Sequence, residues 1–256
     1  MKSGHRAPAR ILRWTLFACA LGLGSLFVGW RVLAAFDFGY PVLYDVLDID
    51  ATIARYAPDN EERPGFERTD RTERERLFAA IARAVRHRGK GLEALTYHAP
   101  NGSLIGPLLT DAEIQHLRDV ATLVTRFERL GWLSLFVLAA LTLAAALRGE
   151  RMPATRYFAA GAAGLAALAG VVLLLAGPVS VFYWLHEQIF PPGHQWFFWY
   201  RESLMSTMMQ APNLFGGIAV LWLLVALPLA AGLFWGARRL LEWRAAAQDA
   251  PDGRAA

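Results

Sequence analysis

Four long apolar stretches constrain this chain more than any other feature of its sequence. They cover residues 11–36, 130–147, 157–183 and 214–237, and none contains a run of charges. A helix needs about 20 mostly apolar residues to cross the hydrocarbon of a bilayer, where every backbone polar group must be paired within the chain. Hydrophobic residues make up 55% of the sequence, which is more than one soluble core could bury. The sequence therefore predicts an all-α membrane protein built on a four-helix transmembrane bundle.

Basic residues beside these stretches predict the orientation of the chain, because Lys and Arg in short segments are retained on the cytoplasmic side. They lie before the first stretch or in its first turn, in residues 148–156 and in residues 238–256, so these segments share one side. The cytoplasmic set is Lys2, Arg6, Arg10, Arg13, Arg148, Arg151, Arg156, Arg238, Arg239 and Arg244. The domains expected are a cytoplasmic N-terminus and first span at 1–36, an extracytoplasmic cap at 37–129 and an extracytoplasmic aromatic loop at 184–213. The net charge of +4 reflects this topology, and we expect no nucleic-acid partner.

The cap has the composition of a small α+β module. Apolar side chains at helical spacing in residues 77–85 predict an amphipathic helix. Asn101–Gly102 stands between two short strand-like runs and predicts a β-hairpin. Thr110 and Glu113 have the spacing of a capping box, which predicts the start of a second helix. No breaker follows before Gly131, so we expect this helix to lead almost directly into the second apolar stretch.

Several catalytic chemistries are excluded by residues that the chain lacks. Cys19 is the only cysteine and lies inside the first apolar stretch, which we interpret as a continuous span rather than a cleaved signal. A cysteine nucleophile and an intrachain disulfide are therefore ruled out. The sequence contains no GxSxG or GxxxxGK[ST] motif, and Phe190 stands where the HExxH zinc motif needs its second histidine. Histidine and carboxylate remain as plausible catalytic groups.

Two histidines flank the membrane on the predicted outer side. His116 and Asp119 are three residues apart on the helix before the second span, and His186 follows the third span. A histidine at the level of the headgroups is more often functional than one on a soluble surface. The simpler alternative is a solvated surface histidine at position 116 and an interfacial hydrogen bond at position 186.

The residues around these histidines match a known family. The runs LTDAEIQHLRDV (residues 109–120) and LHEQIF (residues 185–190), followed by Trp196, resemble the bacterial lipoprotein intramolecular transacylases, which are four-span membrane proteins. In that family an acidic residue, a histidine and Asp-Val precede the second span, and a histidine with aromatic residues follows the third. The matching positions here are Glu113, His116, Asp119–Val120, His186 and Phe190.

The resemblance implies an acyltransferase of the bacterial cytoplasmic (inner) membrane whose active site faces the extracytoplasmic side. Its substrate would be a diacylated lipoprotein, with membrane lipid as the surrounding partner. The sn-2 acyl chain of the diacylglyceryl cysteine would move to the α-amino group of the same cysteine, giving an N-acyl lyso-lipoprotein. No cofactor and no metal are expected.

Each site residue has an expected role in that reaction. His116 and His186 would be the catalytic pair, and the sequence does not decide which is base and which is acid. Asp119 would support His116 by fixing its tautomer, as a carboxylate does in other acyl-transfer sites, and Glu187 would support His186. Phe190 and Trp196 would contact the substrate.

Two other readings remain open from the sequence. The first is a non-enzymatic membrane module that docks a lipid or a partner helix through the aromatic loop, in which case both histidines are dispensable. The second places a metal ion among His116, Asp119, His186 and Glu187. The oligomeric state also remains open.

The topology can be tested with reporters. We predict that a reporter that works only in the cytoplasm is active when it is fused after Ala256, because the flanking arginines retain both termini there. A fusion within the cap should show the opposite activity. A reporter after Ala256 that works only outside the cell would contradict the topology.

Overall fold

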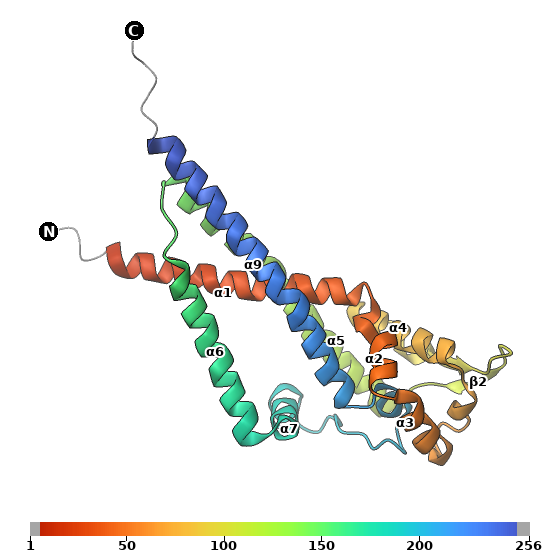
Figure 1. Ribbon diagram of the computed structural model, residues 1–256. Coiled ribbons are helices and arrows are strands. Elements are labelled where there is room, and N and C mark those ends of the chain that lie inside the picture. The colour runs from red at the N-terminus through yellow and green to blue at the C-terminus, as the bar shows by residue number, and fades with distance from the viewer. Residues whose placement is uncertain (1–5, 250–256) are drawn as a thin grey trace, which may run out of the picture. The chain divides into compact units, whose positions relative to one another are not determined.

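The computed structural model describes residues 6–249. Residues 1–5, which include Lys2, and residues 250–256 lie outside that range. It is mostly helical, with one small sheet (Figure 1). The helices are α1 (Arg6–Ala34), α2 (Tyr40–Val46), α3 (Ile49–Tyr56), α4 (Arg71–Arg86), α5 (Asp111–Leu147), α6 (Thr155–Ala176), α7 (Pro178–Ile189), α8 (Leu204–Met209) and α9 (Asn213–Asp249). The strands are β1 (Thr96–His98) and β2 (Leu104–Pro107), and short 3-10 turns occupy Asp37–Gly39, Ala57–Asp59, Phe66–Arg68 and Leu92–Ala94.

Within the described residues, four helices are long and apolar enough to cross a membrane. They are Pro8–Ala34, Asp111–Leu147, Thr155–Ala176 and Asn213–Asp249, and they coincide with the four apolar stretches of the sequence. The chain is therefore a multi-pass membrane protein. The antiparallel hairpin β1–β2 lies between the first two of these helices, which confirms the predicted fold class.

The third membrane helix ends earlier than the sequence predicted. The apolar stretch was expected to continue to residue 183, but α6 ends at Ala176. Gly177 adopts a φ of 78°, in the region that favours glycine, and begins a break in the helix. Pro178 then opens α7, since a proline at the first position of a helix has no amide left unpaired. The residues around His186 therefore belong to a separate short helix.

Helix α5 runs without a break through Gly131, which the sequence suggested as a possible breaker. It has 37 residues. At 1.5 Å per residue this is about 55 Å, roughly twice the thickness of the bilayer hydrocarbon. Charged residues occur from Asp111 to Arg129 and are absent from residues 130–147. The apolar half of α5 coincides with the second apolar stretch of the sequence, and the charged half belongs to the predicted cap.

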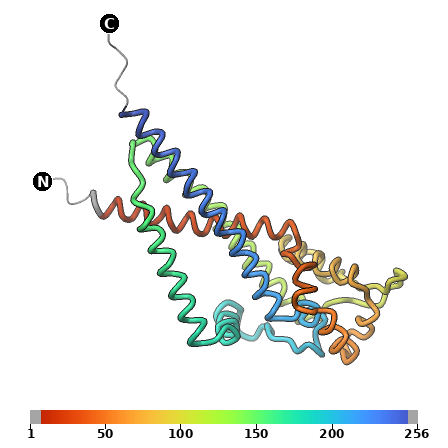
Figure 2. The backbone as a smooth tube through the Cα atoms, in the orientation of Figure 1, coloured from red at the N-terminus to blue at the C-terminus, as the bar shows by residue number. Residues whose placement is uncertain are grey.

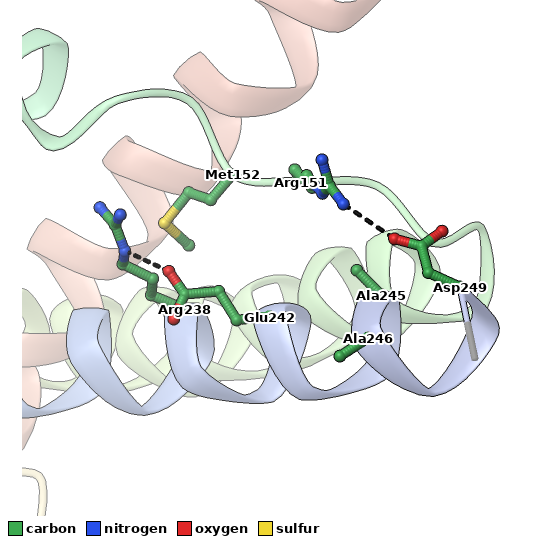
Figure 3. A pocket seen from close by; sticks show the side chains of 7 residues that line it. All are labelled: Arg151, Met152, Arg238, Glu242, Ala245, Ala246 and Asp249. Atoms are coloured by element: carbon green, nitrogen blue, oxygen red, sulfur yellow. Dashed lines mark hydrogen bonds and ion pairs between the residues drawn. The ribbon is translucent and has the colours of Figure 1, made fainter.

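The described residues form two compact units, and the first comprises residues up to 30, 128–172 and from 223 onward. Its core is aromatic. The ring centroid of Phe158 lies within 6.4 Å of those of Trp14, Phe17 and Phe234, and each pair is edge-to-face. Close to the loop before α6, Arg151 forms an ion pair with Asp249 at 2.8 Å, and Arg238 pairs with Glu242 at 2.8 Å (Figure 3).

The second unit, residues 31–127 and 173–222, contains the cap and the aromatic loop. The ring of Tyr40 stacks on Phe78 at a centroid distance of 4.1 Å, and its hydroxyl donates to the carbonyl of Met208 at 2.9 Å. All of α8 is buried in this core. The predicted amphipathic helix is α4, whose apolar side chains at 77, 78 and 81 are buried, and whose N-terminus is capped by Asp70. The cap and the aromatic loop therefore share one hydrophobic core.

Gly131 provides a stability test of the α5 packing. A Cβ atom added to Gly131 would overlap the ring of Phe27. Alanine at an open helical site is about 1 kcal/mol more favourable than glycine, whereas overpacking costs about 1–3 kcal/mol. We predict that Gly131→Ala lowers the melting temperature of the purified protein. Gly232→Ala is the control, because Gly232 lies in α9 with nothing within 4 Å of the added atom. An unchanged or raised melting temperature for Gly131→Ala would contradict the packing.

Candidate active site

The capping box at the start of α5 is present as predicted. The amide of Thr110 donates to Oε2 of Glu113 at 2.6 Å, and the amide of Glu113 donates to Oγ1 of Thr110 at 3.3 Å. Glu113 has a second role, because its Oε1 accepts hydrogen bonds from the hydroxyl of Ser203 and, at 3.4 Å, from the amide of Met205. Burial raises the pKa of this carboxyl, and these donors partly oppose the shift. Glu113 thus joins α5 to the N-terminus of α8.

His116 lies one turn after Glu113, beneath two aromatic rings. Its ring centroid is 4.8 Å from that of Phe190 and 5.8 Å from that of Phe198. Its Nδ1 atom is buried and has no hydrogen-bond partner among residues 6–249. Burial lowers the pKa of His116 to about 4, and the nearby His186 contributes in the same direction. His116 is therefore a neutral imidazole at pH 7.

His186 lies near the end of α7 with rings on several sides. Its centroid is 3.9 Å from Phe182, 5.2 Å from Phe190 and 5.2 Å from Trp196. Its Nδ1 is 2.7 Å from the carbonyl oxygen of Phe182. Because a carbonyl can only accept, Nδ1 carries the proton in the neutral ring and Nε2 holds the free lone pair. Burial lowers the pKa of His186, and the bond to Phe182 partly offsets this shift.

The two histidines come together at Phe190, although they belong to different helices. Phe190 is buried, and its ring contacts both imidazoles. This matches the expectation that residues beside the second and third spans meet at one place. Phe190 and Trp196, predicted to contact the substrate, both lie against His186.

Asp119 has a different partner from the one that the sequence suggested. It was expected to fix the tautomer of His116, but its Oδ2 lies 2.7 Å from Nδ1 of His194. The side-chain amide of Gln115 donates to Nε2 of the same histidine at 2.9 Å. Asp119 acts on His116 only through its charge, which favours the protonated form. The prediction that Asp119 forms an orienting hydrogen bond to His116 was therefore wrong.

His194 was missed because it stands in a loop among aromatic residues, with no helical spacing that pairs it with another polar residue. It follows Pro191, Pro192 and Gly193, residues typical of a turn, and precedes Trp196. A histidine at a turn in a membrane-proximal segment is a signal that could have been weighed. The other predicted supporting residue, Glu187, is exposed and forms no hydrogen bond or ion pair within residues 6–249.

Among residues 6–249, no group of three or more His, Cys, Asp or Glu side chains is placed to hold a metal ion. Asp119 and His194 use their facing atoms on each other. The arrangement offers neutral imidazoles, aromatic walls and a carboxylate, which are groups suited to moving protons in a site of low polarity.

The chain was compared with known proteins at three levels. No protein-family model and no curated protein sequence matches it. Among solved structures, it is similar to the membrane integral lipoprotein intramolecular transacylase from Bacillus cereus, with a TM-score of 0.62 and 12% identity over 93% of this chain and 99% of that one. A variant of the Bacillus protein with one histidine replaced by arginine gives a TM-score of 0.61 at 12% identity, over 93% and 94% of the two chains.

This likeness covers nearly the whole of both proteins. At 12% identity it is a likeness of fold, and it agrees with the family resemblance of the short runs around His116 and His186. The chain therefore has the fold of a membrane-integral lipoprotein intramolecular transacylase.

Proposed function

We propose that this protein is a lipoprotein intramolecular transacylase. The observation that carries the proposal is the meeting of His116 and His186 at Phe190 in a chain with the transacylase fold. The substrate is a diacylated bacterial lipoprotein. Its sn-2 acyl chain moves to the α-amino group of the same cysteine, leaving an N-acyl lyso-lipoprotein.

The reaction needs proton transfer and alignment, and little else. The amine nitrogen attacks the carbonyl carbon of the sn-2 ester, a C–N bond forms, and the bond from that carbon to the sn-2 oxygen breaks. One proton leaves the amine and one proton arrives on the departing oxygen, so the products are an amide and a free hydroxyl. Since donor and acceptor belong to one molecule, their proximity supplies much of the rate and no acyl-enzyme is required.

The geometry favours His186 as the base. The bond from its Nδ1 to the Phe182 carbonyl leaves the Nε2 lone pair free to accept the amine proton. An α-amine has a pKa of about 8 and becomes more acidic as it bonds to the ester carbon, so a neutral histidine can take its proton at that stage. His116, whose ring also contacts Phe190, gives the proton of its ring N–H to the departing sn-2 oxygen, and the proton held by His186 then passes to His116, so both histidines end neutral.

The ring contacts support acyl transfer over ester hydrolysis. Phe190, Trp196 and Phe198 lie within 5.8 Å, centroid to centroid, of one or both histidines. Aromatic walls exclude water from the site, and water would otherwise compete with the amine for the ester. They also suit a substrate that carries acyl chains.

We also propose where the protein acts. The protein lies in the bacterial cytoplasmic membrane with both histidines on the extracytoplasmic side, where lipoproteins carry their lipid. The arginine distribution supports this orientation. The competing function is a lipid-docking or helix-docking module without catalysis, and it differs in leaving both histidines dispensable.

Replacement of the histidines tests the catalytic assignment. We predict that His116→Ala and His186→Ala each lower transacylation about 100- to 10,000-fold, because each residue handles one proton. The measurement is mass spectrometry of lipoprotein N-terminal peptides from a host that lacks its own lyso-lipoprotein synthesis. His116→Gln should be made as well, since it keeps the buried volume beneath Phe190 and Phe198.

Two other histidines serve as controls. His87 is exposed and bonded to the Arg83 carbonyl of its own helix, and His98 bonds to Glu73 in the cap. Both should tolerate alanine. If His116→Ala and His186→Ala accumulate in the membrane and form the lyso product at the level of the unchanged protein, the docking module becomes the better description.

The low pKa of His116 predicts a pH effect on stability. An unfolded histidine titrates near 6.5, whereas folded His116 titrates at about 4. As the pH falls from about 6.5 toward 4, the unfolded chain binds a proton that the folded chain does not, so this residue makes folding less favourable. We predict that His116→Gln shows a smaller drop in melting temperature between pH 7 and pH 5 than the unchanged protein. An equal drop in both would show that His116 is not held neutral.

A further inference from the structure

Residues 190–203, here called the linker segment, connect α7 to α8 and contain no helix or strand (Figure 2). Their backbone hydrogen bonds within the described chain are short-range, such as His194 to Pro191 at 3.1 Å and Ser203 to Trp199 at 3.1 Å. A segment without regular structure takes its position from side-chain contacts. Two of its residues are bonded to α5: His194 to Asp119 and Ser203 to Glu113.

The two attachments lie on either side of His116 along α5. Glu113 is one turn before His116 and Asp119 is one turn after it, since residues three apart are neighbours on a helix. The linker segment passes over His116 between them and places Phe190 and Phe198 against its ring. The position of these rings therefore depends on where the segment is fixed.

We propose that His194 is a positioning residue for acyl transfer: its hydrogen bond to Asp119 fixes the linker segment so that Phe190, Trp196 and Phe198 enclose His116 and His186. This rests on the proposed function. His194 acts as a hydrogen-bond donor and carries no proton in the reaction.

The use of both ring nitrogens of His194 supports this role. Nδ1 donates to the Asp119 carboxylate at 2.7 Å, and Nε2 accepts from the Gln115 amide at 2.9 Å. Both ring nitrogens of His194 are therefore occupied by protein groups. His186 differs, because within residues 6–249 only its Nδ1 has a protein partner. The Asp119–His194 pair thus holds the linker segment in place and does not take part in proton transfer.

The place of His194 in the chain explains why one bond affects both histidines. Phe190 comes four residues before it, Trp196 two residues after it and Phe198 four residues after it. Phe190 and Phe198 contact His116, and Phe190 and Trp196 contact His186. Loss of the bond at the middle of this run frees contacts on both sides. The 75 residues that separate His194 from Asp119 make the bond a tertiary constraint.

Asparagine separates a donor role from a proton-carrying role. Its side-chain NH₂ lies where histidine has Nδ1, so His194→Asn can still donate to Asp119 but cannot titrate. We expect His194→Ala to lower the rate about 10- to 100-fold, because misplacement of about 1 Å at a reacting site costs about that much. His194→Asn should stay within about threefold of the unchanged protein. His87→Ala, at an exposed histidine, is the matched control.

The experiment uses the full chain in membrane discs with a synthetic diacylated lipopeptide, and mass spectrometry counts the N-acyl lyso product. The variants are His194→Ala, His194→Asn, Asp119→Ala, Asp119→Asn and the double alanine variant. The two single alanine variants and the double should lose similar activity, since both ends of one bond are removed. Asp119→Asn keeps an acceptor and should resemble His194→Asn.

Hydrogen–deuterium exchange of residues 190–203 is measured on the same samples. Exchange should rise in the alanine variants and stay low in the asparagine variants. Folded His194→Asn protein as inactive as His194→Ala would overturn the proposal and make His194 a proton carrier. Alanine variants with unchanged rate and exchange would overturn it too. If the unchanged protein makes no product while the exchange pattern holds, the proposed function fails and the attachment stands.

Discussion

The candidate site depends on one continuous helix that carries three of its polar side chains. The backbone of α5 is unbroken over 37 residues, and its first turns belong to the unit that contains the cap and the aromatic loop. Gly131 does not interrupt the helix. The absent side chain there instead makes room for Phe27, and the helix stays intact. Glu113, His116 and Asp119 are held on a rigid element, which suits groups that must align reacting atoms.

Two buried polar groups on α5 contrast in how they are satisfied. Glu113 accepts hydrogen bonds from Thr110, Ser203 and Met205, so its burial is compensated by donors on both carboxyl oxygens. His116 is one turn away, and its Nδ1 has no partner among the described residues. A buried polar atom without a partner costs stability, typically about 1–3 kcal/mol. His116, which contacts both Phe190 and Phe198, bears this cost. An unpaired nitrogen at this position is consistent with a site in which a ligand atom becomes its partner.

How far the sequence predicts this protein depends on the range of each interaction. The spans, the hairpin at Asn101–Gly102 and the capping box of Thr110 and Glu113 arise from residues close in the chain, and each was predicted. The pairing of Asp119 with His194 joins residues 75 apart and was not predicted. The sequence instead suggested His116 as the partner of Asp119, because it is only three residues away in the chain. The break at Gly177 was also missed, because apolar composition continues across it and only the backbone conformation reveals it.

A site built this way suits a reaction in which the substrate brings both reacting groups. Within residues 6–249 no Ser, Thr or Cys side chain is hydrogen-bonded to Nδ1 of His116 or of His186, and the ring of Phe190 contacts both imidazoles. An acyl-enzyme would need such a nucleophile and a base bonded to it. Transfer within one substrate needs instead two proton-handling groups on either side of the reacting ester and walls that keep water away. Burial lowers the pKa of both histidines, and the rings that pack against them contribute to that burial. A change that moves the linker segment would therefore alter both the walls of the site and the pKa values of the histidines.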